Sequence, residues 1–205
     1  MKRCVIISNG ITDLARFNFL PDDYIICADG GIRYAEKFGI KPSLVVGDFD
    51  STDLSKVDFQ TIRYPKEKDV TDTMIAISCG IEQNCTEFVF LCSLGGRLDH
   101  TIANIQNLAE LSQKGINAYI FDEKNIAFVL CGECEQKIKR KDGFKLSIFA
   151  LTNECKGVTL NGVKYPLSDY TLSSLIPLGI SNEFENDFAT IKLKEGRLLV
   201  ILSHD

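Results

Sequence analysis

The sequence predicts an α/β protein in which an N-terminal Rossmann-like domain with a mostly parallel sheet is followed by a C-terminal all-β domain. Two observations lead to this fold class. Up to Gly115, short apolar runs alternate with amphipathic segments, as in parallel strands joined by helices. Beyond Gly115 the pattern changes towards period two and turn signals recur, which indicates antiparallel strands.

Four short apolar runs of the first part are expected to be buried strands: 4–8, 24–28, 43–47 and 87–93. A helix over 32–38 is expected between two of them, and it ends at Gly39, a residue suited to the left-handed position after a helix. These elements alternate as they do in parallel α/β sheets.

Two longer helices are expected further along. One begins near Thr71 or Asp72, and the other follows Asp99 and ends at Gly115. Their apolar stripes follow the three-and-four spacing of a helix face: Met74, Ile77 and Ile81 in the first, and Ile102, Ile105, Leu108, Ala109 and Leu111 in the second. We expect these stripes to face the core.

The second part carries turn signals at 141–143, 161–162 and 195–197. Asn161-Gly162 between 155–160 and 163–166 is typical of a type I′ hairpin, and 194–197 is expected to join strands 189–193 and 198–203. The boundary is placed between Cys131 and Lys141, which gives a domain over 1–132 and a second over 133–205.

The composition limits the kinds of molecule that this protein is expected to bind. A formal charge of -5 over 205 residues gives no general attraction to nucleic acid or to anionic membranes. The N-terminal apolar run is too short for a secretion signal, and no run approaches the length needed to span a bilayer. A small-molecule partner is therefore expected, with no nucleic acid and no membrane.

Eight cysteines indicate a reduced, cytoplasmic protein, because several of them lie inside apolar stretches, where free cysteine behaves as a small hydrophobe. Cys131 and Cys134 form a CxxC pattern, which leaves a structural zinc site and a redox pair open as alternatives to a plain structural role. No second CxxC occurs, and both histidines are distant in sequence.

Acidic residues stand where apolar strands end or helices begin: Asp29, Asp48, Asp50, Asp72 and Asp99. In an open α/β sheet such positions converge on one crevice at the carboxyl ends of the strands. Clustered carboxylates repel one another and need a cation, and a set of oxygen ligands suits Mg²⁺ better than zinc. Because Mg²⁺ is usually shared with substrate phosphates, a nucleotide is the expected partner of the metal.

Glycines and cations support the same interpretation. Two glycine pairs each lie between a strand and a helix: Gly30 and Gly31, and Gly95 and Gly96. The absence of side chains there lets phosphates or a base approach backbone N–H groups. Arg97 and Lys68 are placed to neutralise phosphate charge, and His100 is open between local hydrogen bonding and a ligand contact.

A structural role competes with the functional one for each aspartate, because a single aspartate after a strand is usually an N-cap or a turn former. Asp69 keeps that interpretation. Asp48 and Asp50 have the strongest functional claim, since residues two apart on an extended strand project to one side and reach one ion. Neither a Walker motif nor GxGxxG occurs, so the phosphate site is of another type.

Taken in order, the motifs resemble those of the thiamine pyrophosphokinase family. They are Asp29-Gly30-Gly31, GDFDS at 47–51, DVTD at 69–72 and GGRLDH at 95–100, followed by GVKYPL at 162–167 and GISNE at 179–183. The resemblance implies an α/β catalytic domain that binds ATP and Mg²⁺, then a β-sandwich domain that binds thiamine. It also implies a homodimer whose active sites lie between the catalytic domain of one subunit and the β domain of the other.

Residue roles follow from the same resemblance. Asp48, Asp50 and Asp72 match the ligands that hold Mg²⁺ against the ATP phosphates, and Arg97 and Asp99 match nucleotide contacts. On the thiamine side the matching residues are Ser181, Asn182 and Tyr165, the last at a position where mammalian members have Trp. A Tyr still stacks on a cationic ring.

The implied reaction is transfer of the diphosphate of ATP to the hydroxyl of thiamine, giving thiamine diphosphate and AMP. Lys68 and Arg97 are expected to absorb charge, and Asp72 or Asp99 to accept the proton. The alternatives are a metal-dependent phosphoesterase, since acidic clusters also build hydrolases, and a nucleotide- or thiamine-binding module without turnover.

Overall fold

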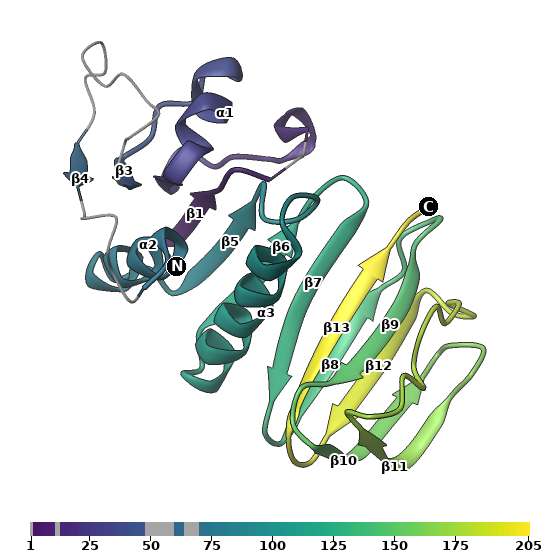
Figure 1. Ribbon diagram of the computed structural model, residues 1–205. Helices are drawn as coiled ribbons and strands as arrows, with labels where there is room; N and C mark the ends of the chain where they lie inside the picture. Colours follow the sequence, from purple (N-terminus) through teal and green to yellow (C-terminus); the bar gives the residue numbers. More distant parts are fainter. Residues whose placement is uncertain (1, 11–12, 48–59, 64–69) are drawn as a thin grey trace. The chain divides into compact units, whose positions relative to one another are not determined.

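The computed structural model describes residues 2–10, 13–47, 60–63 and 70–205. The chain forms two compact units, which we describe separately (Figure 1). The first consists of Met1–Asn107 with Ile116–Glu123, and the second of Leu108–Gly115 with Lys124–Asp205.

A parallel sheet forms the centre of the first unit. Its strands are β1 (Arg3–Ile7), β2 (Tyr24–Ala28), β3 (Leu44–Gly47), β4 (Thr61–Arg63), β5 (Glu87–Leu91) and β6 (Asn117–Phe121). They lie side by side in the order β4-β3-β2-β1-β5-β6, and every pairing between them is parallel. The four predicted strands are confirmed, whereas β4 and β6 were not foreseen.

Helices cover both faces of this sheet. The α-helices are α1 (Ile32–Lys37), α2 (Asp72–Glu82) and α3 (Leu98–Gln113), with short 3₁₀ turns η1 (Leu14–Arg16) and η2 (Asp29–Gly31). On one face, Ile32 and Ala35 of α1 pack into a cluster with Val5, Cys27 and Val45. On the other, α2 contacts β1, β2 and β3. Because both faces are covered, the central strands β1, β2, β3 and β5 are apolar and buried along most of their length.

The predicted stripe of α2 is only partly correct. Ile77 is buried, but Met74 and Ile81 are 36% and 37% exposed, while Ile75 and Ala76 lie in the core. The helix is rotated because Gly80 allows close approach: a Cβ there would lie 2.6 Å from the ring of Phe88. The glycine at position 80 therefore decides which face of α2 packs on the sheet.

The predicted stripe of α3 is also corrected at its N-terminal end. Leu108 and Leu111 are buried as expected, but Ile102 is 50% exposed, and the buried positions of the first turns are polar, at Asn104 and Asn107. Asn104 Nδ2 donates a hydrogen bond to the Ser93 carbonyl oxygen, whereas the buried Nδ2 of Asn107 has no hydrogen-bond partner among the described residues.

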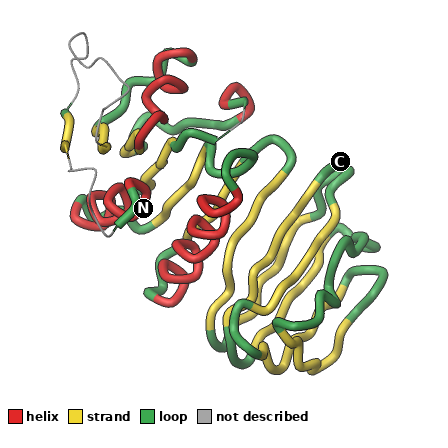
Figure 2. The backbone as a smooth tube through the Cα atoms, viewed as in Figure 1, coloured by secondary structure: helices red, strands yellow, loops and turns green. Residues whose placement is uncertain are grey.

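The second unit is built on antiparallel strands (Figure 2). They are β7 (Asn125–Cys131), β8 (Cys134–Lys139), β9 (Lys145–Ala150), β10 (Glu154–Asn161), β11 (Leu167–Ser173), β12 (Phe188–Leu193) and β13 (Arg197–Ser203). β13 pairs with β7 and β9, and a four-stranded sheet has the order β11-β10-β12-β8. Alternate residues of both groups, such as Leu198, Val200 and Ile191, share one core. The predicted fold class is confirmed.

One predicted hairpin is corrected, and one predicted connection between strands is confirmed. Gly162 has the left-handed φ of 77° expected of a turn, but β10 pairs with β11, which begins only at Leu167. Val163 instead forms a bridge with Phe184. Strands β12 and β13 follow one another as predicted, yet they pair with different partners, because the connection crosses from one sheet to the other.

The compact units divide at a different place from the predicted domains. By its contacts β7 groups with the second unit, because it pairs with β13 along its whole length. The bounds 1–132 and 133–205 therefore remain a prediction about functional domains. None of the helices in the described ranges is both long and apolar enough to cross a membrane.

Candidate active site

A pocket of about 410 Å³ lies at the carboxyl ends of the central strands of the first unit. Its walls come from the segments that follow β1, β2 and β5 and from the N-terminal turns of α2 and α3. The strand order reverses between β1 and β5, since β2 and β3 continue on one side and β6 on the other. Ligands of open α/β sheets bind at this switch point.

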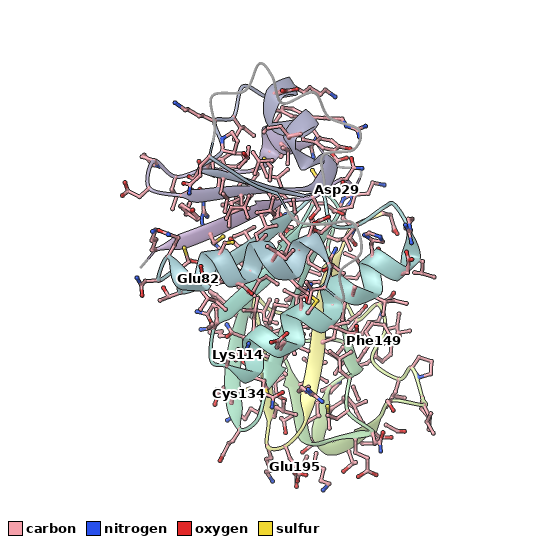
Figure 3. All side chains as sticks on the ribbon, turned by 60° about the vertical axis from the view of Figure 1, so that its left-hand side comes forward. Asp29, Glu82, Lys114, Cys134, Phe149 and Glu195 are labelled. Carbon is pink, nitrogen blue, oxygen red and sulfur yellow. The ribbon has the colours of Figure 1, made fainter. Side chains whose placement is uncertain are left out.

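Asp29 begins the wall after β2. Its φ of 52° is left-handed, a conformation that costs a non-glycine residue free energy, and the residue is exposed. Figure 3 shows Asp29 well apart from Glu82, which lies at the C-terminal end of α2. Asp29 and the first residue of α2, Asp72, both line the pocket, as predicted for two of the clustered carboxylates.

The glycines after Asp29 have a packing role. Gly30 and Gly31 are buried and do not line the pocket. A Cβ on Gly31 would lie 2.0 Å from the carbonyl oxygen of Ile7, and one on Gly30 would lie 2.5 Å from the side chain of Asn9. These glycines let η2 and α1 approach β1, which is a different reason from the predicted approach of phosphates.

A glycine that was not singled out closes the floor of the pocket. Gly10 donates a backbone hydrogen bond to the Cys92 carbonyl, and a Cβ there would lie 2.4 Å from the Leu94 carbonyl oxygen. Cys92 has a left-handed φ of 53°, so the chain turns sharply after β5. Burial raises the pKa of the Cys92 thiol to about 12, which keeps it protonated and excludes it as a nucleophile at neutral pH.

The N-terminus of α2 points into this pocket. Thr71 is the N-cap, and its hydroxyl oxygen accepts a hydrogen bond of 3.2 Å from the backbone N–H of Met74. Thr71, Asp72 and Thr73 all line the pocket. The backbone N–H groups and the positive end of the helix dipole favour negative charge here, such as that of a phosphate.

Loss of this N-cap should lower the free energy of unfolding by a measurable amount. We expect Thr71→Ala to lower the free energy of unfolding by about 1 kcal/mol, because Met74 N–H loses its acceptor, whereas Thr71→Ser should stay close to wild type. Urea titration followed by circular dichroism measures both. An equal loss in the two variants would contradict the capping role.

The N-terminus of α3 supplies the cation of the site. Arg97 and Asp99 form a double hydrogen bond, with Nε to Oδ1 at 3.1 Å and Nη2 to Oδ2 at 2.5 Å, and both side chains are well exposed. The hydrogen bond from Arg97 lowers the pKa of Asp99. Arg97 and His100 line the pocket, whereas Asp99 does not. Asp99 thus contacts Arg97 and the backbone N–H of His100.

Buried polar groups under the pocket were missed from the sequence. Asn104 is 5% exposed, and its Nδ2 donates to the Ser93 carbonyl oxygen at 3.0 Å. The Ser93 hydroxyl donates to the Leu91 carbonyl oxygen at 3.2 Å and lies 3.5 Å from the Ser8 hydroxyl. The available signal was a gap in the stripe of α3, where Asn104 occupies a core position of the helix.

Three predicted residues lie outside the described part of the chain: Asp48, Asp50 and Lys68. Of the second glycine pair, Gly96 lines the pocket and Gly95 adopts a left-handed φ of 75° beside it. Among the described residues, His, Cys, Asp and Glu side chains form no group of three able to hold a metal. Asp72 is the described member of the predicted ligand set.

The predicted thiamine-side residues lie together in the second unit. Tyr165 is 64% exposed, and Asn182, which is 4% exposed, bonds its backbone at 3.0 and 2.8 Å. Ser181 is exposed and has a left-handed φ of 56°. Its backbone N–H donates to the Ser147 hydroxyl at 2.9 Å. The structure therefore brings the three residues to one place.

An open α/β sheet with a switch-point pocket, two helix N-termini and an exposed arginine defines a protein that binds a phosphorylated ligand. Comparison with known families identifies which one. Residues 19–120 match the model of the thiamin pyrophosphokinase catalytic domain, and residues 135–198 match that of the thiamin pyrophosphokinase vitamin B1 binding domain. The chain belongs to the thiamin pyrophosphokinase family and is an enzyme with ATP and thiamine as substrates.

Individual relatives agree with this assignment. The chain is 30% identical to thiamine pyrophosphokinase of Bacillus subtilis over 176 residues, which cover 82% of the chain and 81% of that protein. A crystal structure of thiamine pyrophosphokinase from B. subtilis superposes with a TM-score of 0.90 at 26% identity and complete coverage of both chains. That of Geobacillus thermodenitrificans gives 0.88 at 27%, covering 99% and 98%.

Proposed function

We propose that the switch-point pocket of the first unit binds ATP with Mg²⁺, and that Asp48, Asp50 and Asp72 hold the metal. The observation that carries the proposal is the position of Asp72. Asp72 begins α2 and lines the same pocket as Asp29 and Arg97, so two carboxylates and a cation line one ligand-binding pocket. These carboxylates provide the oxygen ligands that Mg²⁺ prefers, and bound Mg²⁺ would neutralise phosphate charge and polarise the phosphorus.

In the proposed reaction the thiamine hydroxyl oxygen forms a bond to the β-phosphorus of ATP. The bond between that phosphorus and the α,β-bridging oxygen breaks, and AMP leaves with the electron pair. The protein supplies little covalent chemistry, so its contribution is alignment and charge stabilisation. Arg97 and Lys68 take up charge on the transferred group, and the backbone N–H groups at the start of α2 bind phosphate oxygens. Asp29, Gly95, Gly96 and His100 contact the nucleotide.

The hydroxyl proton needs an acceptor, and the structure favours Asp72 over Asp99 for that role. Both carboxylate oxygens of Asp99 accept hydrogen bonds from Arg97. Asp99 also lies outside the pocket lining, whereas Asp72 belongs to it. We therefore assign Asp99 to the orientation of Arg97.

We propose that thiamine is bound by the second unit and that the enzyme is a homodimer. The exposed ring of Tyr165 offers a face for the cationic thiazolium, and Ser181 stands beside it. A neighbouring segment carries apolar side chains with large exposed fractions: Leu175 89%, Ile176 63%, Leu178 45% and Ile180 51%. Such a patch is typical of a protein–protein contact, and a second subunit is the partner we assign to it.

We further propose a reducing, cytoplasmic location. All eight cysteines lie in described parts of the chain and are free, and six of them are buried. An oxidising compartment would favour disulfides in a chain with this many cysteines.

Product analysis tests the proposed function. Incubation of the protein with ATP, Mg²⁺ and thiamine should give equimolar AMP and thiamine diphosphate, with no AMP when thiamine is left out. Phosphate release without thiamine would instead support the phosphoesterase alternative. Thiamine binding by calorimetry without any product would support a binding module and overturn the proposal.

A further inference from the structure

Asn182 is almost completely buried, although it lies in the motif expected to bind thiamine. It is 4% exposed, and its own backbone pairs with Leu146, with N–H to oxygen distances of 2.8 and 2.9 Å in the two directions. Residue 182 is therefore fixed to the edge of β9, a strand of the second unit. A side chain this buried has little surface left with which to contact a ligand.

The side-chain amide of Asn182 forms hydrogen bonds with the backbone of Tyr165. Its Oδ1 accepts from the Tyr165 N–H at 3.0 Å and from the Glu183 N–H at 3.1 Å, and its Nδ2 donates to the Tyr165 carbonyl oxygen at 2.8 Å. The amide thus takes the place of a neighbouring strand and satisfies both polar groups of one residue.

Contacts between the adjacent residues Lys164 and Glu183 strengthen the attachment of the Tyr165 segment. The Lys164 N–H donates to the Glu183 carbonyl oxygen at 3.0 Å, and the Lys164 ammonium lies 3.3 Å from the Glu183 carboxylate. While the backbone groups of Tyr165 are held, the residue as a whole is 64% exposed. A fixed backbone under an exposed ring is the arrangement that pre-organises an aromatic contact and lowers the entropy lost on binding.

We propose that Asn182 is a positioning residue for thiamine, which acts through Tyr165 and does not itself contact the substrate. The proposal deepens the proposed function and rests on it, because it takes thiamine as the ligand of the Tyr165 ring. It replaces the expected substrate contact of Asn182 by two hydrogen bonds to the Tyr165 backbone, and it leaves Ser181 and Glu183 as exposed polar residues of the motif.

Steady-state kinetics test the role. In Asn182→Asp a carboxylate oxygen replaces the Nδ2 donor opposite the Tyr165 carbonyl oxygen, so we expect the KM for thiamine to rise about tenfold or more, with the KM for ATP within about twofold. Asn186→Asp makes the same change at an exposed position four residues along and should keep both constants. Equal rises in the two KM values would overturn the proposal.

A double variant separates positioning from direct contact. Tyr165→Ala removes the ring but leaves the backbone groups that Asn182 bonds. If Asn182 acts through the ring, adding Asn182→Asp to Tyr165→Ala changes the thiamine KM no further. Multiplication of the two effects would show that Asn182 contacts thiamine directly and would overturn the inference.

Amide exchange distinguishes failure of the attachment from failure of the proposed function. In Asn182→Ala the Tyr165 amide should exchange at least about tenfold faster, whereas the Leu146 amide keeps its backbone acceptor at residue 182 and serves as internal control. Unchanged exchange at Tyr165 overturns the attachment. Accelerated exchange in a protein that makes no thiamine-dependent AMP overturns the proposed function and leaves the attachment standing.

Discussion

Asp72→Asn should lower the rate of thiamine-dependent AMP formation by about 10³-fold, the size of effect seen when a single group that stabilises transition-state charge is removed. The change deletes a carboxylate from the pocket but keeps the side-chain size. If Asp72 is a Mg²⁺ ligand, the Mg²⁺ concentration for half-maximal rate should also rise. Both quantities come from AMP release measured over a Mg²⁺ titration.

The fold should survive this change. Thr71 rather than Asp72 caps α2, so Asp72→Asn keeps the N-cap and weakens the favourable interaction with the helix dipole, which is worth about 1 kcal/mol or less. Glu82→Gln is the matched control, since it removes one exposed charge from the opposite end of the same helix and should leave turnover within about twofold. Retention of more than about a tenth of wild-type turnover by Asp72→Asn would contradict the catalytic role.

The sequence was most informative about where the carboxyl ends of strands meet. A parallel sheet places all those ends at one edge, so Asp29 and Asp72 were predicted to converge, and they line one pocket. The same reasoning applies to Asp48 and Asp50, which lie outside the described residues and remain predictions. The assignment to thiamine depended on motif order and was confirmed by family comparison.

Side-chain environment was much harder to predict. Asn104 reads as an interruption of an apolar stripe, and only tertiary contact with Ser93 shows that it belongs to the floor of the pocket. Asn182 was assigned to substrate because its motif binds substrate in the family, yet burial directs its amide to the Tyr165 backbone. Pairing of β12 with β8 rather than β13 depends on long-range packing, which local turn signals do not encode.

Gly31→Ala should lower the free energy of unfolding by about 3 kcal/mol or more, because the added methyl group would meet main-chain atoms that cannot rotate away. A Cβ there would lie 2.0 Å from the Ile7 carbonyl oxygen, so α1 would have to move off β1 and disturb the cluster around Ile32 and Ala35.

Gly39→Ala is the control at the other end of α1. Its φ of 65° costs a non-glycine residue about 1 kcal/mol, and nothing lies within 4 Å of an added Cβ. Urea titration at 25 °C compares the two variants. A small loss of stability in Gly31→Ala together with a raised KM for ATP would contradict the packing role. It would support the original prediction that Gly31 lies against the phosphates.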